Sequence, residues 1–188
     1  MIIGIDKHTL PLLPGNFYHI FNRGNNREKI FYIESNYRYF LKKYDEYMSG
    51  CVDTYAYCLL PNHFHFLIRI KDDINNEKKV SEQFRKLFIT YSQAINKQEK
   101  RTGSLFTKRF KRKLVKDTGS LPHLVFYIHH NPVHHKIGIS LENYRWSSYS
   151  KILEPKKSIL LKNEVLEWFD GVEGYVEYHR NSREIKNE

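Results

Sequence analysis

The stretch from Pro61 to Ile70, PNHFHFLIRI, constrains the fold of this chain more than any other segment. Side chains alternate across a β-strand, so this stretch has two faces of opposite character. The first face begins with His63 and His65, two imidazoles close enough to bind one ion. The second face is apolar throughout and predicts contact with a core; it consists of Phe64, Phe66, Ile68 and Ile70.

Length and composition favour one folded domain, because 188 residues with 40% hydrophobic and 15% aromatic side chains can bury a core. No apolar run approaches the roughly 20 residues that span a bilayer. The N-terminus has an acid and a proline where a signal peptide needs an apolar stretch. We therefore predict a cytoplasmic protein without a membrane partner. Cys51 and Cys58 would face opposite sides of one strand, which favours free thiols.

The formal net charge of +10 predicts attraction to a phosphate polymer, although solubility alone is an alternative explanation. The charge is concentrated between Lys100 and Lys116, where eight residues are basic and none is acidic. Leucines, phenylalanines and a valine interleave with these charges. A basic β-ribbon beside a nucleic-acid cleft needs such apolar residues, whereas a solvated tail does not.

Periodicity and turn residues predict the order of the secondary-structure elements. The elements expected are a strand at 17–22, a helix from Ser35 to Gly50, strands at 52–60 and 63–70, a helix beginning at Ser81, basic strands after Gly103, a helix at 121–130 that Asn131-Pro132 interrupts, a linker at 154–157 and a short helix at 162–170.

This order predicts an α+β domain in which helices cover one face of an antiparallel sheet and the other face is free to bind a ligand. The Phe64 row would lie under the helices and the His63 row on the open face. We place the domain at residues 1–150. Residues 151–188 are expected to form a linker and a short helical appendage.

Two histidines at i and i+2 on a rigid strand suit a divalent metal, although this pair alone is a weak signal. A metal facing a phosphodiester would stabilise charge in the transition state, but the reaction also needs a nucleophile. Fourteen tyrosines compete for that role. In the helix at 121–130, Tyr127 lies about 105° from the centre of the apolar stripe, whereas Tyr44 and Tyr91 lie on theirs. Tyr127 is therefore one of several candidates.

His63-Phe64-His65 resembles the His-hydrophobic-His (HUH) motif of single-tyrosine transposases, and its surroundings are most similar to the REP-associated tyrosine transposases. The resemblance covers about residues 17–150. It rests on FNRGNNREKIF (21–31), YCLLPNHFHFLIRI (57–70), RTGSLFTKRFK (101–111), YIHHNPVHHKIG (127–138) and YRWSSY (144–149).

This resemblance implies a ferredoxin-like (RRM-like) fold with the HUH motif on a central strand. It also implies a transposase that cuts and rejoins single-stranded or hairpin DNA. Tyr127 would attack the scissile phosphate, giving a 5′-phosphotyrosine and a free 3′-hydroxyl. His63 and His65 would hold Mg²⁺ or Mn²⁺. Relatives place a polar residue one turn after the tyrosine, where this chain has Asn131. Asn131 could instead cap a helix that begins with the following proline.

Four further histidines, at 129, 130, 134 and 135, could bind a second metal, but solvated or phosphate-facing side chains are the favoured interpretation. Trp146 and Tyr149 could stack on bases, with packing favoured. The expected contacts to DNA are Asn22, Arg23, Arg27, Lys108, Arg109, Lys111 and Arg112, each of which could be an ordinary surface charge.

Two other functions remain open. A non-catalytic or domesticated protein could bind nucleic acid through the open face of such a sheet. A replication- or relaxase-type HUH nickase would share the chemistry, although the short chain argues against it. The simplest insertion-sequence relatives exchange the tyrosine helix in a dimer, whereas a monomer is slightly favoured here.

Overall fold

The sheet of this protein is antiparallel and has four strands. A computed structural model describes residues 10–137 and 140–181. The strands are β1 (Phe17–Arg23), β2 (Val52–Leu60), β3 (His63–Ile70) and β4 (Lys111–Leu114), in the spatial order β2-β3-β1-β4. With a helix after β1 and another after β3, this is the ferredoxin-like arrangement, which confirms the predicted class and places the histidine strand in the centre. The ends of the predicted domains, 1–9 and 182–188, lie outside the described residues, and the boundary near 150 stays a prediction.

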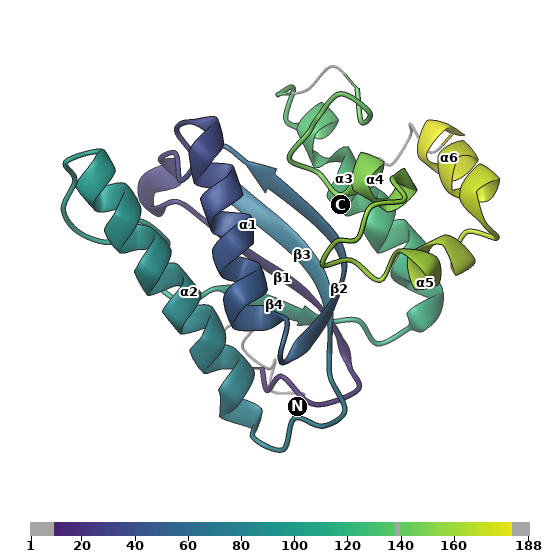
Figure 1. Ribbon diagram of the computed structural model, residues 1–188, viewed down its shortest axis with the longest axis horizontal. Coiled ribbons are helices and arrows are strands. Elements are labelled where there is room, and N and C mark those ends of the chain that lie inside the picture. The colour runs from purple at the N-terminus through teal and green to yellow at the C-terminus, as the bar shows by residue number, and fades with distance from the viewer. Residues whose placement is uncertain (1–9, 138–139, 182–188) are drawn as a thin grey trace, which may run out of the picture.

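Helices lie on both sides of the sheet (Figure 1). The α-helices are α1 (Glu34–Met48), α2 (Glu77–Gln98), α3 (Leu121–His134), α4 (Tyr149–Leu153), α5 (Lys162–Glu167) and α6 (Val172–Asn181); η1 (Asn25–Arg27) and η2 (Thr118–Ser120) are 3-10 turns. As predicted, α1 and α2 cover one face. On the other face α3 lies against β2 and β3, so only part of that face stays uncovered. Among the helices of residues 10–137 and 140–181, none could cross a membrane.

The core between the sheet and its first two helices is built from aromatic rings. Tyr44 of α1 stacks on Phe66 of β3, with ring centroids 4.2 Å apart. Phe40 packs on Phe64 at 5.3 Å. The predicted apolar row of β3 is therefore the helix-covered face, and strand alternation sends His63 and His65 to the opposite one.

The helices predicted to start at Ser35 and Ser81 both begin earlier, at Glu34 and Glu77, so neither serine caps its helix. Asn36 contacts the start of α1: its Oδ1 accepts hydrogen bonds from the backbone N–H groups of Tyr32 and Ile33. Asn76 caps α2 by accepting from the N–H of Lys78 at 2.9 Å. Ser81 lies inside α2 instead. Asparagine competes with serine for such positions, so the pattern of apolar residues alone could not choose the cap.

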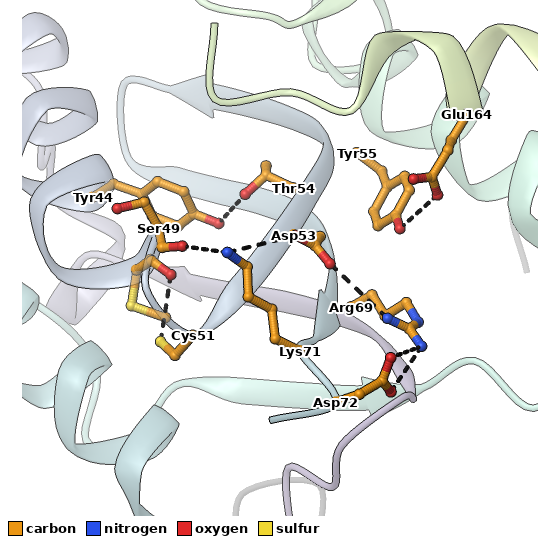
Figure 2. Close-up of polar contacts among 11 residues, drawn as sticks. Tyr44, Ser49, Cys51, Asp53, Thr54, Tyr55, Arg69, Lys71, Asp72 and Glu164 are labelled. Atoms are coloured by element: carbon orange, nitrogen blue, oxygen red, sulfur yellow. Dashed lines mark hydrogen bonds and ion pairs between the residues drawn. The ribbon is translucent and has the colours of Figure 1, made fainter. Parts of the chain in front are cut away.

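Polar contacts fasten α1 and α5 to opposite sides of β2 (Figure 2). The hydroxyls of Tyr44 and Thr54 lie 2.8 Å apart. The Tyr55 hydroxyl donates to Glu164 of α5 at 2.9 Å. The β2–β3 register shifts between Thr54 and Ala56, which makes Tyr55 the extra residue of a bulge. Residues beyond 150 thus pack on the sheet through this tyrosine.

A chain of hydrogen bonds through two buried histidines connects α3 to α6 and β2. Nδ1 of His179, on α6, lies 2.8 Å from the carbonyl oxygen of Tyr175. Nε2 of the same ring lies 3.0 Å from Nδ1 of His129. Nε2 of His129 lies 2.7 Å from Oγ of Ser148, which accepts from the Tyr57 N–H. One orientation satisfies every group: each neutral ring donates through Nδ1 and accepts through Nε2. His129 is therefore neither solvated nor placed as a metal ligand, which corrects that expectation.

This histidine chain predicts that the protein loses stability in mild acid. Burial lowers the pKa of His179 to about 4 and that of His129 well below its usual value. The unfolded histidines, with a pKa near 6.5, bind protons more tightly, so stability present above pH 6.5 is lost as the pH falls toward 4. Each histidine contributes roughly 1.4 kcal/mol per pH unit within its window. Urea unfolding at pH 7, 6 and 5 measures this slope. His179→Gln should be less stable at pH 7 with a shallower slope, and an equal slope would contradict the assignment.

The space around Gly24, in the turn after β1, leaves no room for a side chain. A Cβ at this position would collide with the backbone carbonyl of Glu28. Gly24→Ala should therefore lower the free energy of unfolding by about 1–3 kcal/mol. Gly50→Ala is the matched control, because no atom lies within 4 Å of its Cβ position. Chemical denaturation of both variants makes the test, and equal stability would refute the steric argument.

Candidate active site

The two motif histidines share a hydrogen-bonded face with a third histidine from β1. The β1–β3 register pairs Phe21 with His65 and His19 with Leu67, so all four side chains lie on the same side of the sheet. Nε2 of His19 lies 2.9 Å from Nδ1 of His65. The two imidazoles are stacked at 5.1 Å, and Phe21 stacks on His65 at 5.7 Å.

All three imidazoles on this face are held neutral. Burial, and then the nearby charge of Lys113, lowers the pKa of His19 to about 3. Burial, with His135 and Arg23 adding smaller effects, lowers the pKa of His63 to about 4. Burial also lowers the pKa of His65 well below its usual value. Neutral imidazole has a free lone pair, which is the form that binds metal ions.

The His19–His65 contact determines which nitrogen of His65 can act as a ligand. If His65 donates its Nδ1 proton to His19, the lone pair of its Nε2 is free. The reverse arrangement would put the proton on Nε2 and prevent binding there. A second hydrogen bond of this kind commonly fixes the tautomer of a metal-binding histidine.

Tyr127 lies against this histidine face from α3. Its ring meets those of His65 and His19 edge-on, with centroids 5.9 and 6.0 Å apart. It remains 42% exposed, whereas Tyr44 and Tyr91, on their apolar stripes, are buried. Partial burial raises the pKa of the Tyr127 phenol, and the Asn131 side chain opposes that shift. Helical periodicity thus separated the exposed tyrosine from the core tyrosines.

The helix that carries Tyr127 does not end at Asn131-Pro132, which corrects the predicted interruption. α3 continues to His134 with Pro132 inside it. Proline has no N–H for the carbonyl of Ile128, and Nδ2 of Asn131 donates to that carbonyl at 3.4 Å and to the Tyr127 carbonyl at 2.7 Å. The capping interpretation of Asn131 is therefore wrong. Because Nδ2 is used by the backbone, Oδ1 is the atom of this amide left for a cation.

The other histidines near the C-terminal end of α3 differ in their surroundings. His130 stacks on Phe126 at 5.0 Å, and His134 and His135 are exposed at the C-terminal end. The ring of His135 meets that of His63 at 4.7 Å. Within residues 10–137 and 140–181, no three His, Cys, Asp or Glu side chains converge as a metal site. An amide such as Asn131 falls outside that set of residue types.

Two side chains near this site were missed by sequence reasoning, His19 and Lys113. Lys113 pairs with His19 across β1 and β4, so both face the same side. The alternation of side chains in the predicted strand at 17–22 indicates which of its residues share a face. It does not indicate that this strand lies beside β3, and without that neighbour His19 could not be assigned to the site. Sequence alone gave the strand but not its neighbours.

The predicted DNA contacts divide into an exposed group and a buried group. Arg23, Arg27, Lys108 and Arg109 are exposed, and none of them forms an ion pair within the part of the chain that the structure describes. Lys111 is half-buried on the histidine face, with its ammonium 5.6 Å from the Phe21 ring centroid.

Asn22 and Arg112 form the buried group. Asn22 accepts a hydrogen bond from the Thr107 hydroxyl at 2.6 Å, and Arg112 donates to the Leu10 carbonyl and Ser81. Trp146 stacks on Tyr37 at 4.5 Å, and Tyr149 is buried, as the packing interpretation favoured.

Comparisons with known proteins bear on the family and the fold of this chain. A protein of Haemophilus influenzae named after the REP-associated tyrosine transposases is 27% identical over 105 residues, which are 53% of this chain and 60% of that protein. The chain thus matches about three fifths of that relative's length. A solved structure of a REP-associated tyrosine transposase bound to a REP hairpin superposes with a TM-score of 0.65 at 16% identity, covering 82% of this chain and 90% of that one, which supports the fold. Residues 15–131 match the family described as "Transposase IS200 like", and the chain belongs to this family.

Proposed function

We propose that this protein is a metal-dependent transposase that cuts and rejoins single-stranded DNA through Tyr127. The observation that carries the proposal is the contact of the Tyr127 ring with His65 and His19, on the histidine face of the sheet. A half-exposed phenol beside neutral imidazoles brings a nucleophile and candidate metal ligands together. The membership in the IS200-like transposases supports the same activity.

The residues present fit a divalent cation. His63 and the Nε2 atom of His65 offer neutral nitrogen ligands, and Asn131 offers an amide oxygen near Tyr127. Mg²⁺ and Mn²⁺ accept such mixed nitrogen and oxygen donors, with water and phosphate oxygens completing the coordination. When bound, the ion supplies Lewis-acid stabilisation of charge on the scissile phosphate. The exposed His135, beside His63, is a further possible contributor from the same chain.

Tyr127 would act as the nucleophile in the cleavage step and as the leaving group when a 3′-hydroxyl rejoins the strand. Its phenol oxygen forms a bond to phosphorus as the bond from phosphorus to the 3′-oxygen breaks. The phenol proton leaves and the departing 3′-oxygen gains one. The 5′-phosphotyrosine conserves the phosphodiester bond energy, so a later 3′-hydroxyl can reverse the step without an external energy source. A raised phenol pKa means that Tyr127 needs help to ionise at neutral pH, which agrees with the expected metal dependence.

The DNA would approach along the uncovered part of the histidine face. Lys111 and Lys113 project from β4 on this side, and Arg23 lies opposite His63 in the β1–β3 register. These cations can neutralise phosphates without reading sequence. The related transposase was solved with a REP hairpin, which makes hairpin DNA the first substrate to try.

A single chain contains every residue of the proposed site, because α3 contacts the histidines of its own sheet. This supports the proposal that the protein works as a monomer. The rival function, a protein that binds nucleic acid without cutting it, would use the same basic face and would leave no covalent product.

Tyr127→Phe should abolish a covalent protein–DNA product while leaving DNA binding intact, because only the attacking oxygen is lost. The assay uses hairpin-bearing single strands from the flanks of the coding region, labelled at the 3′ end and resolved on denaturing gels with Mn²⁺. The 3′ label should appear on the wild-type protein and disappear with EDTA. Tyr39→Phe, on the opposite side of the sheet, is the matched control and should react normally. Normal cleavage by Tyr127→Phe would refute the assignment.

His19→Ala should weaken binding of Mn²⁺ in the absence of DNA by roughly 10–100-fold, because His65 loses the partner that fixes its tautomer. Calorimetry or electron paramagnetic resonance measures the affinity directly. His19→Gln should recover part of it, since its side-chain oxygen can accept the His65 proton. His123→Ala, an exposed histidine at the start of α3, is the control. Equal affinity in His19→Ala would contradict the positioning role.

A further inference from the structure

A cavity of about 860 Å³ lies between α2 and the segment 103–112 that leads into β4. It is separate from the histidine face. Arg112 pairs with Ile20, which belongs to the helix-covered side, whereas the neighbouring pairs Phe21–Lys111 and His19–Lys113 face the histidines. Its volume lies within the range of about 300–1,000 Å³ that small-molecule sites occupy. The proposed function does not use this cavity.

The cavity has an aromatic lining and an apolar residue in its helical wall. Phe88, Phe106 and Phe110 line it, with Phe88 only half-buried. Ile89 of α2 also lines it and is 43% exposed, so it adds an apolar side chain that an incoming ligand can reach. Flat aromatic and apolar walls suit a planar, weakly polar group such as a nucleobase.

Arg112 supplies charge at the buried end of the cavity. Its side chain is only 8% exposed, and its Nε has no hydrogen-bond partner among the described residues. One terminal nitrogen donates to Ser81 at 2.9 Å and to the Leu10 carbonyl at 3.1 Å, and the guanidinium lies 4.2 Å from the Phe110 ring centroid. No carboxylate lies within 4 Å of it in the described part of the chain. A buried cation with an unused donor and no anion is costly, and a bound phosphate would compensate it.

The basic residues between 108 and 113 connect this cavity to the histidine face. Strand alternation sends Lys111 and Lys113 to the histidine side and Arg112 to the cavity side. Lys108 and Arg109 line the cavity and are exposed. The cations thus extend around the β4 edge of the sheet from one side to the other, which gives a single strand of DNA a continuous electrostatic path.

We propose that this cavity binds one unstacked nucleotide of the single-stranded DNA, with its base between Ile89 and the phenylalanines and its phosphate near Arg85 and Arg112. The site is a DNA-binding subsite distinct from the cleavage centre, so it would select strands that present a free base at a fixed distance from the cut. This inference rests on the proposed function for its ligand. The experiments below can refute the nucleotide site without refuting the proposed function, or the proposed function without refuting the nucleotide site.

The experiment measures fluorescence anisotropy of a labelled 20-nucleotide single strand and of a blunt duplex of the same sequence, without metal. Ile89→Glu places a negative charge in the cavity from an exposed position and should weaken single-strand binding at least about five-fold. Duplex binding should change less, since a duplex offers no free base. Val172→Glu, at a 53% exposed position at the start of α6, is the matched control and should bind like wild type.

Arg85→Gln tests the phosphate contact against Lys86→Gln, its exposed neighbour on α2, which does not line the cavity. The slope of log affinity against log salt concentration should become shallower by about one unit more in Arg85→Gln than in Lys86→Gln, because one phosphate contact is lost. Photocrosslinking of a strand with 5-iodouracil should give adducts in the peptide that contains Phe106 and Phe110.

Equal single-strand affinity of Ile89→Glu and Val172→Glu, or crosslinks confined to other peptides, would overturn the nucleotide site. An equal loss of duplex binding would also overturn it, because the cavity would then contact the backbone alone. The covalent product of Tyr127 is a separate measurement. If wild-type protein forms that product while Ile89→Glu binds normally, the cavity proposal fails and the proposed function stands. If no product forms but Ile89→Glu binds weakly, the reverse holds.

Discussion

Hydrogen bonding between β1 and β3 brings His19 and His65 onto the same side of the sheet, 2.9 Å apart at their ring nitrogens. A slip of one residue in this pairing would turn every β1 side chain to the opposite face. The register is fixed by the buried side, where Tyr18 and Ile20 must meet the same core as Phe66 and Ile68. The packing of the hydrophobic core therefore determines the geometry of the polar face.

Asn131 compensates for a backbone hydrogen-bond donor that is missing in the helix that carries Tyr127. Pro132 removes a backbone donor inside α3, and the Asn131 amide supplies hydrogen bonds to the carbonyls of Tyr127 and Ile128. The same contacts orient the amide beside the tyrosine. An Asn-Pro pair four residues after Tyr127 thus continues the helix, which explains why neither a cap nor a simple break describes it.

The sequence predicted the strands well because their patterns are local. The alternation of β3 alone identified its core face, and the apolar stripe of α3 separated Tyr127 from the buried tyrosines. The predictions that failed concerned residues whose contacts lie far away in the sequence. Ser81 resembled a cap, but its hydroxyl accepts from Arg112, 31 residues away. His129 resembled its exposed neighbours, yet it completes a chain of hydrogen bonds with Ser148 and His179. Asn22 and Arg112 were predicted to contact DNA at the surface, but Asn22 pairs with Phe64 and Arg112 with Ile20, which places both on the helix-covered side.

The histidine chain also bears on how α3 is held. His129 follows Tyr127 by two residues, about 200° around the helix, so the two side chains point in nearly opposite directions. One contacts the histidine face, and the other is hydrogen-bonded through Ser148 to β2 and through His179 to α6. The tyrosine helix is thereby fastened to its own sheet from behind. Moving α3 away from the sheet would break those buried hydrogen bonds, each of which is costly to leave unmade. Residues beyond 150 thus help to hold α3 against the sheet of its own chain.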